Sequence, residues 1–590
     1  MTEARIRWIS GPVLRAVTEE RFALREAVEV GPQRLLGEVV SLDGDELVVQ
    51  VYEDTTGLKP GVSIRGTGHP LAIRVGPGLL GRIFDGLLRP LAVTDSPFVT
   101  PGVAPLRSDA LAFRPAVKKG DRLTGGATFG EAVGTGGRVQ RCLVPPGVAG
   151  EVVSIAGAGD YPENATLLAL RDATGAAREI AMSHPWPVRV PRPVRARSPG
   201  TRPLVTGQRI LDCLFPIGQG GKAAIPGGFG TGKTVLLEAL AKGCDADVIV
   251  YLGCGERGNE MAGVLEEFPE LTDPRSGRPL MERTVIIANT SNMPVAAREA
   301  SIYSAATVAE YFRDQGLHVA LMADSTSRWA EALREVSGRF GELPGEAGYP
   351  AYLSSRIAEF YERAAVVETL GGTCGSVTLM GAISPPSGDF SEPVTSHTKR
   401  YVRAFWALDV KRAQARFYPA IDPLASYAED AHVFAEWWAA NGNPQWLALR
   451  RKFLTLLDDQ ARLERMARII GKDALPLRQQ LTLFCAELVN EAFLRQSALS
   501  AIDRSASPAR QSAMMRLVGR YIDLADAAVS AGAKLEALAA LPCYRAALRM
   551  SEEIGEQEDD KFAALAESVE REIGALIHAG KRDDAAKAVG

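Results

Sequence analysis

The sequence predicts a multidomain α/β protein: an N-terminal β-barrel, a second β-rich stretch, a central parallel-sheet domain around a phosphate-binding loop, and a C-terminal helical domain. Three observations predict this class: short β-type runs between Gly-Pro and Asp-Gly turns, apolar strands alternating with helices, and helical periodicity near the end. With 590 residues the chain is too long for one core. The predicted domains are residues 1–75, 110–185, 76–109 together with 186–430, and 431–590.

Composition describes an ordinary globular protein, with 46% hydrophobic and 23% charged residues. A net charge of −4 gives no field that would gather nucleic acid, so no nucleic-acid partner is expected. The sequence shows neither a signal peptide nor the run of about 20 apolar residues that a membrane-spanning helix needs. Seven dispersed cysteines indicate a reducing, cytoplasmic setting.

The N-terminal third is rich in β-type runs. Residues 46–52 form a short β-type run, and such runs, broken by Gly-Pro and Asp-Gly turns, are typical of a small barrel. A second β-rich stretch includes residues 145–153, and the proline-dense segment 185–193 follows it. Repeated prolines favour an extended connector.

The central region alternates strands and helices. Continuous apolar runs suit strands of a parallel sheet that is buried on both faces, and they lie at residues 248–252, 284–288, 319–323 and 377–382. Between them, residues 294–315 are expected to be helical, with Asn292 as the cap and Gly316 after the last turn.

Helical patterns dominate beyond about residue 430. Near the end, apolar residues recur at spacings of three and four and predict one buried helix face: Phe562, Leu565, Val569, Ile573 and Leu576. Burial against the core is the preferred interpretation of this stripe, and a partner-binding groove is the alternative.

A phosphate-binding loop lies between an apolar strand and a helix. It consists of Gly227, Gly228, Phe229, Gly230, Thr231, Gly232, Lys233 and Thr234. Glycines allow backbone N–H groups to surround phosphate oxygens at the positive end of a helix. The Lys233 ammonium can reach the β- and γ-phosphates, and the Thr234 hydroxyl can ligate Mg²⁺. The pattern predicts that the chain binds a nucleoside triphosphate.

Two predicted strands end in residues suited to hydrolysis. Glu256 and Arg257 follow one strand, where a carboxylate can activate water and a guanidinium can bind phosphate. Asp324 ends another strand, where it can hold Mg²⁺ through water. The alternatives are a surface Arg–Glu ion pair and a helix cap, but the shared edge of one parallel sheet favours a catalytic site.

Longer sequence segments support the interpretation of a nucleotide-hydrolysing site. The chain resembles the catalytic A-type subunits of the V/A-type rotary ATPases at residues 253–261, 287–300, 323–335 and 388–395. The similarity is strongest from about 200 to 425. The resemblance implies a RecA-like nucleotide-binding domain and identifies 110–185 as the inserted bulge domain. It also implies a soluble sector that is attached to the membrane only through other subunits.

The resemblance implies a role for each residue. Glu256 would be the general base, Arg257 a γ-phosphate contact and Lys233 the group that neutralises developing charge. Thr234 and Asp324 would hold Mg²⁺ with ATP or ADP. The partners would be a non-catalytic B subunit in an alternating A3B3 hexamer, which supplies an arginine finger, and the central and peripheral stalks. The rotor that moves H⁺ or Na⁺ would be an indirect partner.

Two places differ from this family and resemble the F-type beta subunit. The family usually has proline where Gly228 stands, and Asn-Trp where Asp422-Pro423 stands. In F-type subunits a tyrosine stacks on adenine, so Tyr418 is the candidate base contact, with simple hydrophobic packing as the alternative. Two other functions stay open: a secretion-type hexameric ATPase and a catalytically silent nucleotide binder.

Overall fold

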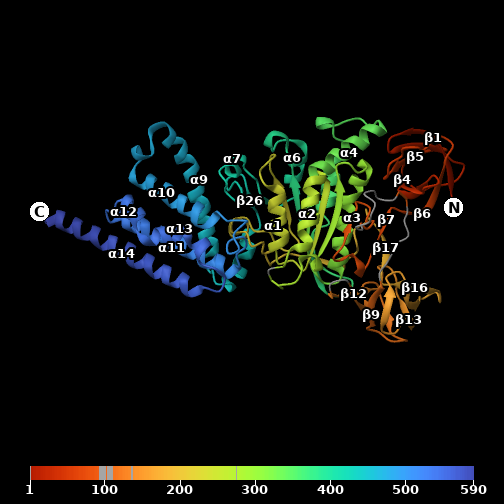
Figure 1. Ribbon diagram of the computed structural model, residues 1–590, viewed down its shortest axis with the longest axis horizontal. Helices are drawn as coiled ribbons and strands as arrows, with labels where there is room; N and C mark the ends of the chain where they lie inside the picture. Colours follow the sequence, from red (N-terminus) through yellow and green to blue (C-terminus); the bar gives the residue numbers. More distant parts are fainter. Residues whose placement is uncertain (1, 92–100, 103–109, 135–136, 274, 590) are drawn as a thin grey trace. The chain divides into compact units, whose positions relative to one another are not determined.

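The computed structural model describes residues 2–91, 101–102, 110–134, 137–273 and 275–589 (Figure 1). The chain forms two compact units: residues 1–200, 219–222 and 246–402, and residues 201–218, 223–245 and 403–590. Part of the predicted segment 76–109 lies outside the described residues. The predicted domain boundaries therefore stay predictions.

The first unit begins with the predicted barrel. Its strands are β1 (Glu3–Ser10), β2 (Val13–Val17), β3 (Glu26–Val30), β4 (Leu35–Asp43), β5 (Glu46–Val51) and β6 (Ser63–Pro70). They close in the order β1-β2-β5-β4-β3-β6. In β5, Leu47 and Val49 point into the core while Glu46 and Val48 are less buried. This alternation places one face of each strand inside the barrel.

Two four-stranded sheets follow the barrel in sequence. The strands are β9 (Ala110–Pro115), β10 (Arg122–Leu123), β11 (Thr128–Val133), β12 (Val139–Leu143), β13 (Gly150–Ile155), β14 (Gly159–Pro162), β15 (Thr166–Arg171) and β16 (Ala177–Ala181). One sheet has the order β10-β13-β15-β16 and the other β12-β11-β9-β14. Phe113, Phe129 and Leu170 belong to their own buried cluster. The β-rich composition of this stretch therefore gives a separate small core.

The first unit also contains a parallel sheet. Its strands are β8 (Ile83–Phe84), β20 (Val248–Glu256), β21 (Thr284–Thr290), β22 (His318–Asp324) and β24 (Cys374–Ile383). They lie in the order β24-β22-β20-β21-β8, and every neighbouring pair is parallel. The four apolar runs that the sequence indicated are all strands of this sheet. Because the strands are parallel, β20, β21 and β22 end at one edge.

Helices and short strands complete the first unit. The helices are α2 (Gly258–Glu270), α3 (Val295–Asp314), α4 (Thr326–Phe340), α5 (Leu353–Tyr361) and α6 (Pro393–Lys399). The short strands are β7 (Ala72–Val75), β17 (His184–Pro187), β18 (Ala196–Ser198) and β23 (Ala365–Glu368). β7 pairs with β17, and β23 joins β18 to the edge of β24.

The cap predicted for α3 is wrong. Pro294, and not Asn292, occupies the cap position, and its extended ψ of 136° prevents the helix from starting earlier. The Asn292 side chain instead accepts a hydrogen bond from the Thr290 hydroxyl, within a turn closed by the Met293 amide and the Thr290 carbonyl. The end of the helix agrees with the prediction, since Gly316 follows it with a φ of 82°.

The second unit contains the strand before the phosphate loop and the C-terminal helices. The strands β19 (Lys222–Pro226), β25 (Ala404–Phe405) and β26 (Tyr427–Ala428) lie in the order β26-β25-β19. The helices are α1 (Lys233–Gly243), α7 (Val410–Gln414), α8 (Ala435–Ala440), α9 (Trp446–Ile470), α10 (Leu477–Leu488), α11 (Pro508–Ser530), α12 (Leu535–Ala540), α13 (Pro542–Glu553) and α14 (Asp559–Val589). α14 packs on α11, and four of its five predicted stripe residues are buried. Among the helices that the structure describes, none has the length and apolar character to span a membrane.

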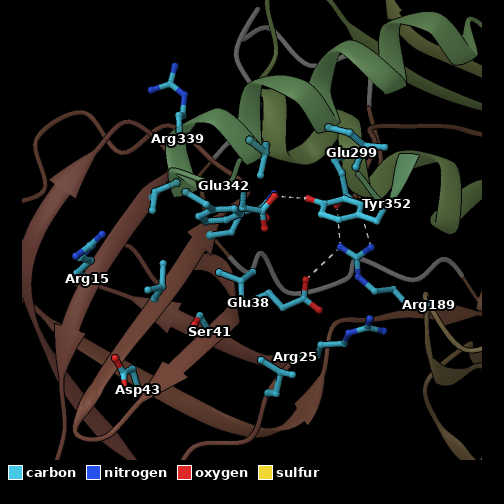
Figure 2. Close-up of a pocket in the computed structure, with 18 of the residues that line it drawn as sticks. Arg15, Arg25, Glu38, Ser41, Asp43, Arg189, Glu299, Arg339, Glu342 and Tyr352 are labelled. Carbon is cyan, nitrogen blue, oxygen red and sulfur yellow. Dashed lines mark hydrogen bonds and ion pairs between the residues drawn. The ribbon is translucent and has the colours of Figure 1, made fainter. Parts of the chain in front are cut away.

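A buried arginine connects the barrel to α3 in the first unit. Arg189 donates to both carboxylate oxygens of Glu299 on α3, at 2.9 and 2.8 Å, and to Glu38 of β4 at 3.2 Å. Figure 2 shows this arrangement beside a cavity of about 510 Å³ between the barrel and α4. Buried charges need such partners, because an unpaired one would lose its hydration without compensation.

A second buried ion pair lies farther along α3. Arg363 donates to both oxygens of Glu310 at 2.6 Å, and the Arg192 amide donates to the same carboxylate at 2.9 Å. Glu310 is 1% exposed and Arg363 is 4% exposed. Every residue of α3 from Ala296 to Asp314 is buried. The extended segment after β17 is therefore held to α3 by charged hydrogen bonds.

We expect Glu310→Gln to destabilise the protein by about 3–5 kcal/mol, because it leaves the buried Arg363 charge without its anion. Urea unfolding of the full chain should show a lower midpoint. The matched control is Glu359→Gln, since the Glu359 side chain is 55% exposed and pairs with Arg356 at 3.0 Å. This control should cost less than about 1 kcal/mol. Equal midpoints for the two variants would contradict the assigned importance of the buried pair.

Candidate nucleotide-binding and catalytic site

The phosphate loop has the predicted strand-loop-helix context. β19 ends at Pro226 and α1 begins at Lys233, with residues 227–232 between them. Gly230 and Gly232 have φ values of 76° and 82°, a region that side chains disfavour. The first amides of α1 follow directly. The loop therefore precedes a helix N-terminus, which favours anions.

Side chains of the loop bond to its own backbone. The Lys233 ammonium donates to the carbonyls of Gly227 and Gly228 at 2.8 and 3.0 Å. The buried Thr231 hydroxyl also donates to the Gly228 carbonyl, at 2.8 Å. Phe229 is 83% exposed at the outside of the loop. These bonds hold the lysine at the start of α1.

A glycine is required at position 227 because neighbouring side chains lie close to its backbone. A Cβ at this position would lie 2.5 Å from the Thr231 hydroxyl oxygen and 2.9 Å from the Leu408 Cβ. Leu408 is held there because its amide donates to the Pro226 carbonyl at 2.8 Å. Gly228, by contrast, has no positive φ. The backbone at position 228 is therefore not in the left-handed region, which would exclude the proline that the family usually has there.

A cavity of about 450 Å³ lies beside the loop in the same unit. It is lined by loop residues 230–232, by the segment 417–420 and by residues 495–499. Tyr418 lies in this lining, and its carbonyl accepts from the Gln496 amide at 2.7 Å. Burial raises the pKa of the Tyr418 hydroxyl, which has no hydrogen-bond partner in the described chain. The volume suits a small organic ligand.

The predicted carboxylates lie together in the first unit. Glu256 is the last residue of β20 and Asp324 the last of β22, and Gly253 is in register with Asp324. Asp324 is buried, Glu256 is half-buried, and Arg257 is exposed at the N-cap position of α2. The phosphate loop and Tyr418 belong to the second unit.

The surroundings of Glu256 favour its protonated form. Burial is the largest cause, followed by the negative charge of Asp324 and a hydrogen bond with the Glu260 carboxyl. Arg328 opposes these effects, and together they raise the pKa of Glu256 to about 8. A base with a pKa near the working pH is effective in proton transfer. Sequence reasoning missed Glu260 and Arg328, although Glu260 stands only four residues after Glu256, in the first turn of α2.

The chemistry of the donor set fits Mg²⁺. Thr234, in the second unit, offers a hydroxyl, and Asp324, in the first unit, offers a carboxylate. Each is an oxygen donor of the kind that Mg²⁺ prefers, and this ion also keeps several waters. The described residues contain no cluster of three or more His, Cys, Asp or Glu side chains arranged to hold a metal.

Four family models match consecutive parts of the chain. The beta-barrel domain of the ATP synthase alpha/beta family matches residues 6–68, and the barrel-sandwich domain of these subunits matches 104–189. The family's nucleotide-binding domain matches 207–428. The C-terminal domain of V and A type ATP synthase matches 435–539.

Curated relatives match nearly the whole chain. The A subunit of the A-type ATP synthase of Thermococcus onnurineus is 48% identical and covers 97% of this chain and 99% of its own. That of Methanoregula boonei is 51% identical over 89% of both chains. The V-type ATP synthase alpha chain of Halothermothrix orenii is 47% identical over 95% of this chain and 97% of its own.

A solved structure shares the fold at lower identity. The assembled ATPase EscN of the enteropathogenic E. coli type III secretion system has a TM-score of 0.62 and 23% identity, over 87% of this chain and 99% of its own. This likeness concerns the fold alone. The near-complete matches at about half identity show that the chain belongs to the family of the A, or alpha, subunits of A-type and V-type ATP synthases, whose members hydrolyse or synthesise ATP.

Proposed function

We propose that the chain hydrolyses or forms ATP at a site in which Glu256 is the general base. The observation that carries this proposal is the half-buried Glu256 carboxylate beside Asp324 at the edge of a parallel sheet. With a pKa of about 8, Glu256 is mostly protonated at neutral pH, and the fraction that has lost its proton is a stronger base toward water than an ordinary glutamate. Membership of an ATP synthase family agrees with this chemistry.

The phosphate loop binds the nucleotide in this proposal. Backbone amides of residues 227–234 surround the phosphates, and Lys233 neutralises charge that develops on the transferred phosphoryl group. Arg257, exposed beside Glu256, binds the γ-phosphate. Thr234 and, through water, Asp324 would hold Mg²⁺, which would offset phosphate charge. Tyr418 stacks on the adenine in the cavity beside the loop.

The family implies a hetero-oligomeric ATP synthase complex. We infer an alternating A3B3 hexamer in which a B subunit supplies an arginine to the site, with central and peripheral stalks linking it to an ion-translocating rotor. An arginine of this kind raises the rate by about 10³ to 10⁵. The isolated chain should therefore hydrolyse ATP poorly.

Neither alternative function is favoured. A secretion-type ATPase agrees with the shared fold of EscN, but the 23% identity is half that of the ATP synthase relatives. The presence of all the expected site residues argues against a catalytically silent binder: Lys233, Thr234, Glu256, Arg257 and Asp324. The Asp422 carboxylate accepts from the Leu424 amide at 2.9 Å, and its charge also acts on Arg412, so this departure has a structural explanation within its own segment.

Glu256→Gln should lower ATP turnover by at least about 10²-fold in the assembled complex, because it removes the base and keeps the size of the side chain. Nucleotide affinity should remain close to that of the parent. Steady-state hydrolysis and ATP titration measure the two quantities. Near-normal turnover would refute the role of Glu256.

Lys233→Ala is the companion variant in that experiment. It removes a phosphate contact from both the ground state and the transition state, so affinity and turnover should fall together. Tight ATP binding by this variant would mean that residues 227–234 are not the nucleotide site.

The raised pKa of Glu256 predicts a pH dependence. Glu256 keeps its proton up to about pH 8, and the base must be deprotonated, so kcat/KM should fall as the pH drops below about 8. Glu260→Gln removes a charge and a hydrogen bond that both raise this pKa, so the acid limb should move to lower pH. Glu266→Gln, on an exposed side of the same helix, is the control and should leave the limb unmoved. If the acid limb of the pH profile does not move in Glu260→Gln, that limb belongs to the titration of another group.

Tyr418→Ala should weaken ATP binding by about 1–3 kcal/mol, the range for aromatic side chains that stack on bases. Tyr418→Phe should bind nearly as the parent does, because the hydroxyl makes no hydrogen bond in the described chain. The control is Tyr427→Ala, which removes a ring stacked on Phe405. It should lower thermal stability without changing affinity. Unchanged affinity in Tyr418→Ala would exclude Tyr418 from the site.

A further inference from the structure

A buried arginine on α3 lies beneath the turn that carries Glu256. Arg298 is 9% exposed. Its guanidinium donates to the Ser291 carbonyl at 3.0 Å, while its Nε has no hydrogen-bond partner among the described residues. None of the roles proposed above uses this side chain. A buried guanidinium is costly to desolvate, so its position calls for an explanation.

The guanidinium stem contacts the backbone at Gly255. A Cβ on Gly255 would lie 2.8 Å from both Cδ and Nε of Arg298, and 2.9 Å from the Arg328 Cβ. Gly255 has a φ of 72°, and the register of β20 against β21 shifts between Cys254 and Glu256. The backbone therefore turns at Gly255 directly against Arg298. This turn sets the direction in which the next residue, Glu256, leaves the strand.

Hydrogen bonds extend the contact to both neighbours of Gly255. The Arg298 carbonyl accepts from the Cys254 thiol at 3.6 Å. The Ser291 amide donates to the Glu256 carbonyl at 2.8 Å, and Ser291 is the residue whose carbonyl Arg298 binds. The Arg298 side chain therefore packs against Gly255 and reaches Glu256 through Ser291, while its backbone carbonyl bonds to Cys254.

We propose that Arg298 is a positioning residue that fixes the backbone turn at Gly255 and thereby aims the Glu256 carboxylate at the attacking water. This inference rests on the proposed role of Glu256 as the base. Catalysis depends steeply on the placement of such a group, and an error of about 1 Å can cost up to about 100-fold in rate. Nucleotide binding belongs to other residues, so Arg298 should affect turnover and not affinity.

The test uses Arg298→Met in the assembled complex, because methionine keeps part of the stem and removes the guanidinium. We expect kcat to fall by about 10- to 100-fold while the KM for ATP stays within about twofold. Arg298→Lys should recover part of the loss, since lysine keeps a charged donor for the Ser291 carbonyl. No recovery with lysine would contradict a role for the donor to the Ser291 carbonyl.

A double-mutant cycle separates this proposal from the proposed function. If Arg298 acts through Glu256, Arg298→Met should change kcat by less than about twofold in a Glu256→Gln background. Equal losses in both backgrounds would overturn the positioning role. Normal turnover in Arg298→Met with low turnover in Glu256→Gln would overturn only the inference about Arg298. Normal turnover in Glu256→Gln would overturn the base assignment and the inference with it.

Two further variants guard against a general loss of structure. Gly255→Ala places a methyl group against Arg298 at an unfavourable φ, so it should lower kcat with the same dependence on Glu256. It keeps the test decisive if Arg298→Met fails to assemble. Arg363→Met removes another buried arginine of the same unit, and it should lower the melting temperature while leaving the KM and the Glu256 dependence of kcat unchanged.

Discussion

The first unit depends on the requirement that the charges along α3 be paired. This helix is buried on all sides, yet it carries Glu299, Glu310 and Asp314. Their partners Arg189, Arg363 and Arg192 come from other segments of the unit. In a medium of low dielectric, losing one partner costs more than the pair contributes. The extended segment after β17 must therefore lie where its arginines can pair with carboxylates of the helix. One of these arginines, Arg189, also pairs with Glu38 of the barrel.

The same helix reaches the candidate site from its other side. Glu299 binds the arginine that contacts the barrel, while its neighbour Arg298 packs under Gly255. Consecutive residues of a helix point in directions about 100° apart, so one rigid element can touch the barrel and the Glu256 turn.

Burial and like charge give Glu256 its chemical character. A half-buried carboxylate loses hydration, and Asp324 and Glu260 add negative charge nearby, so the proton is held until about pH 8. The edge of the parallel sheet creates this situation, because strands that run in one direction bring their terminal carboxylates together. The departures from the family at Gly228 and Asp422-Pro423 belong to the second unit.

The sequence by itself determined the barrel, the parallel sheet, the phosphate loop and the strand-end positions of Glu256 and Asp324, since each follows from local periodicity or a contiguous motif. It predicted the wrong cap for α3, because the prediction used the general preference of asparagine for cap positions and not the extended backbone of Pro294, which delays the start of the helix. Only the tertiary structure decided that Glu260 and Arg328 surround Glu256 and that Arg298 supports its turn. Those contacts depend on a register shift at Gly255 and on burial by distant segments, and neither leaves a pattern in local sequence.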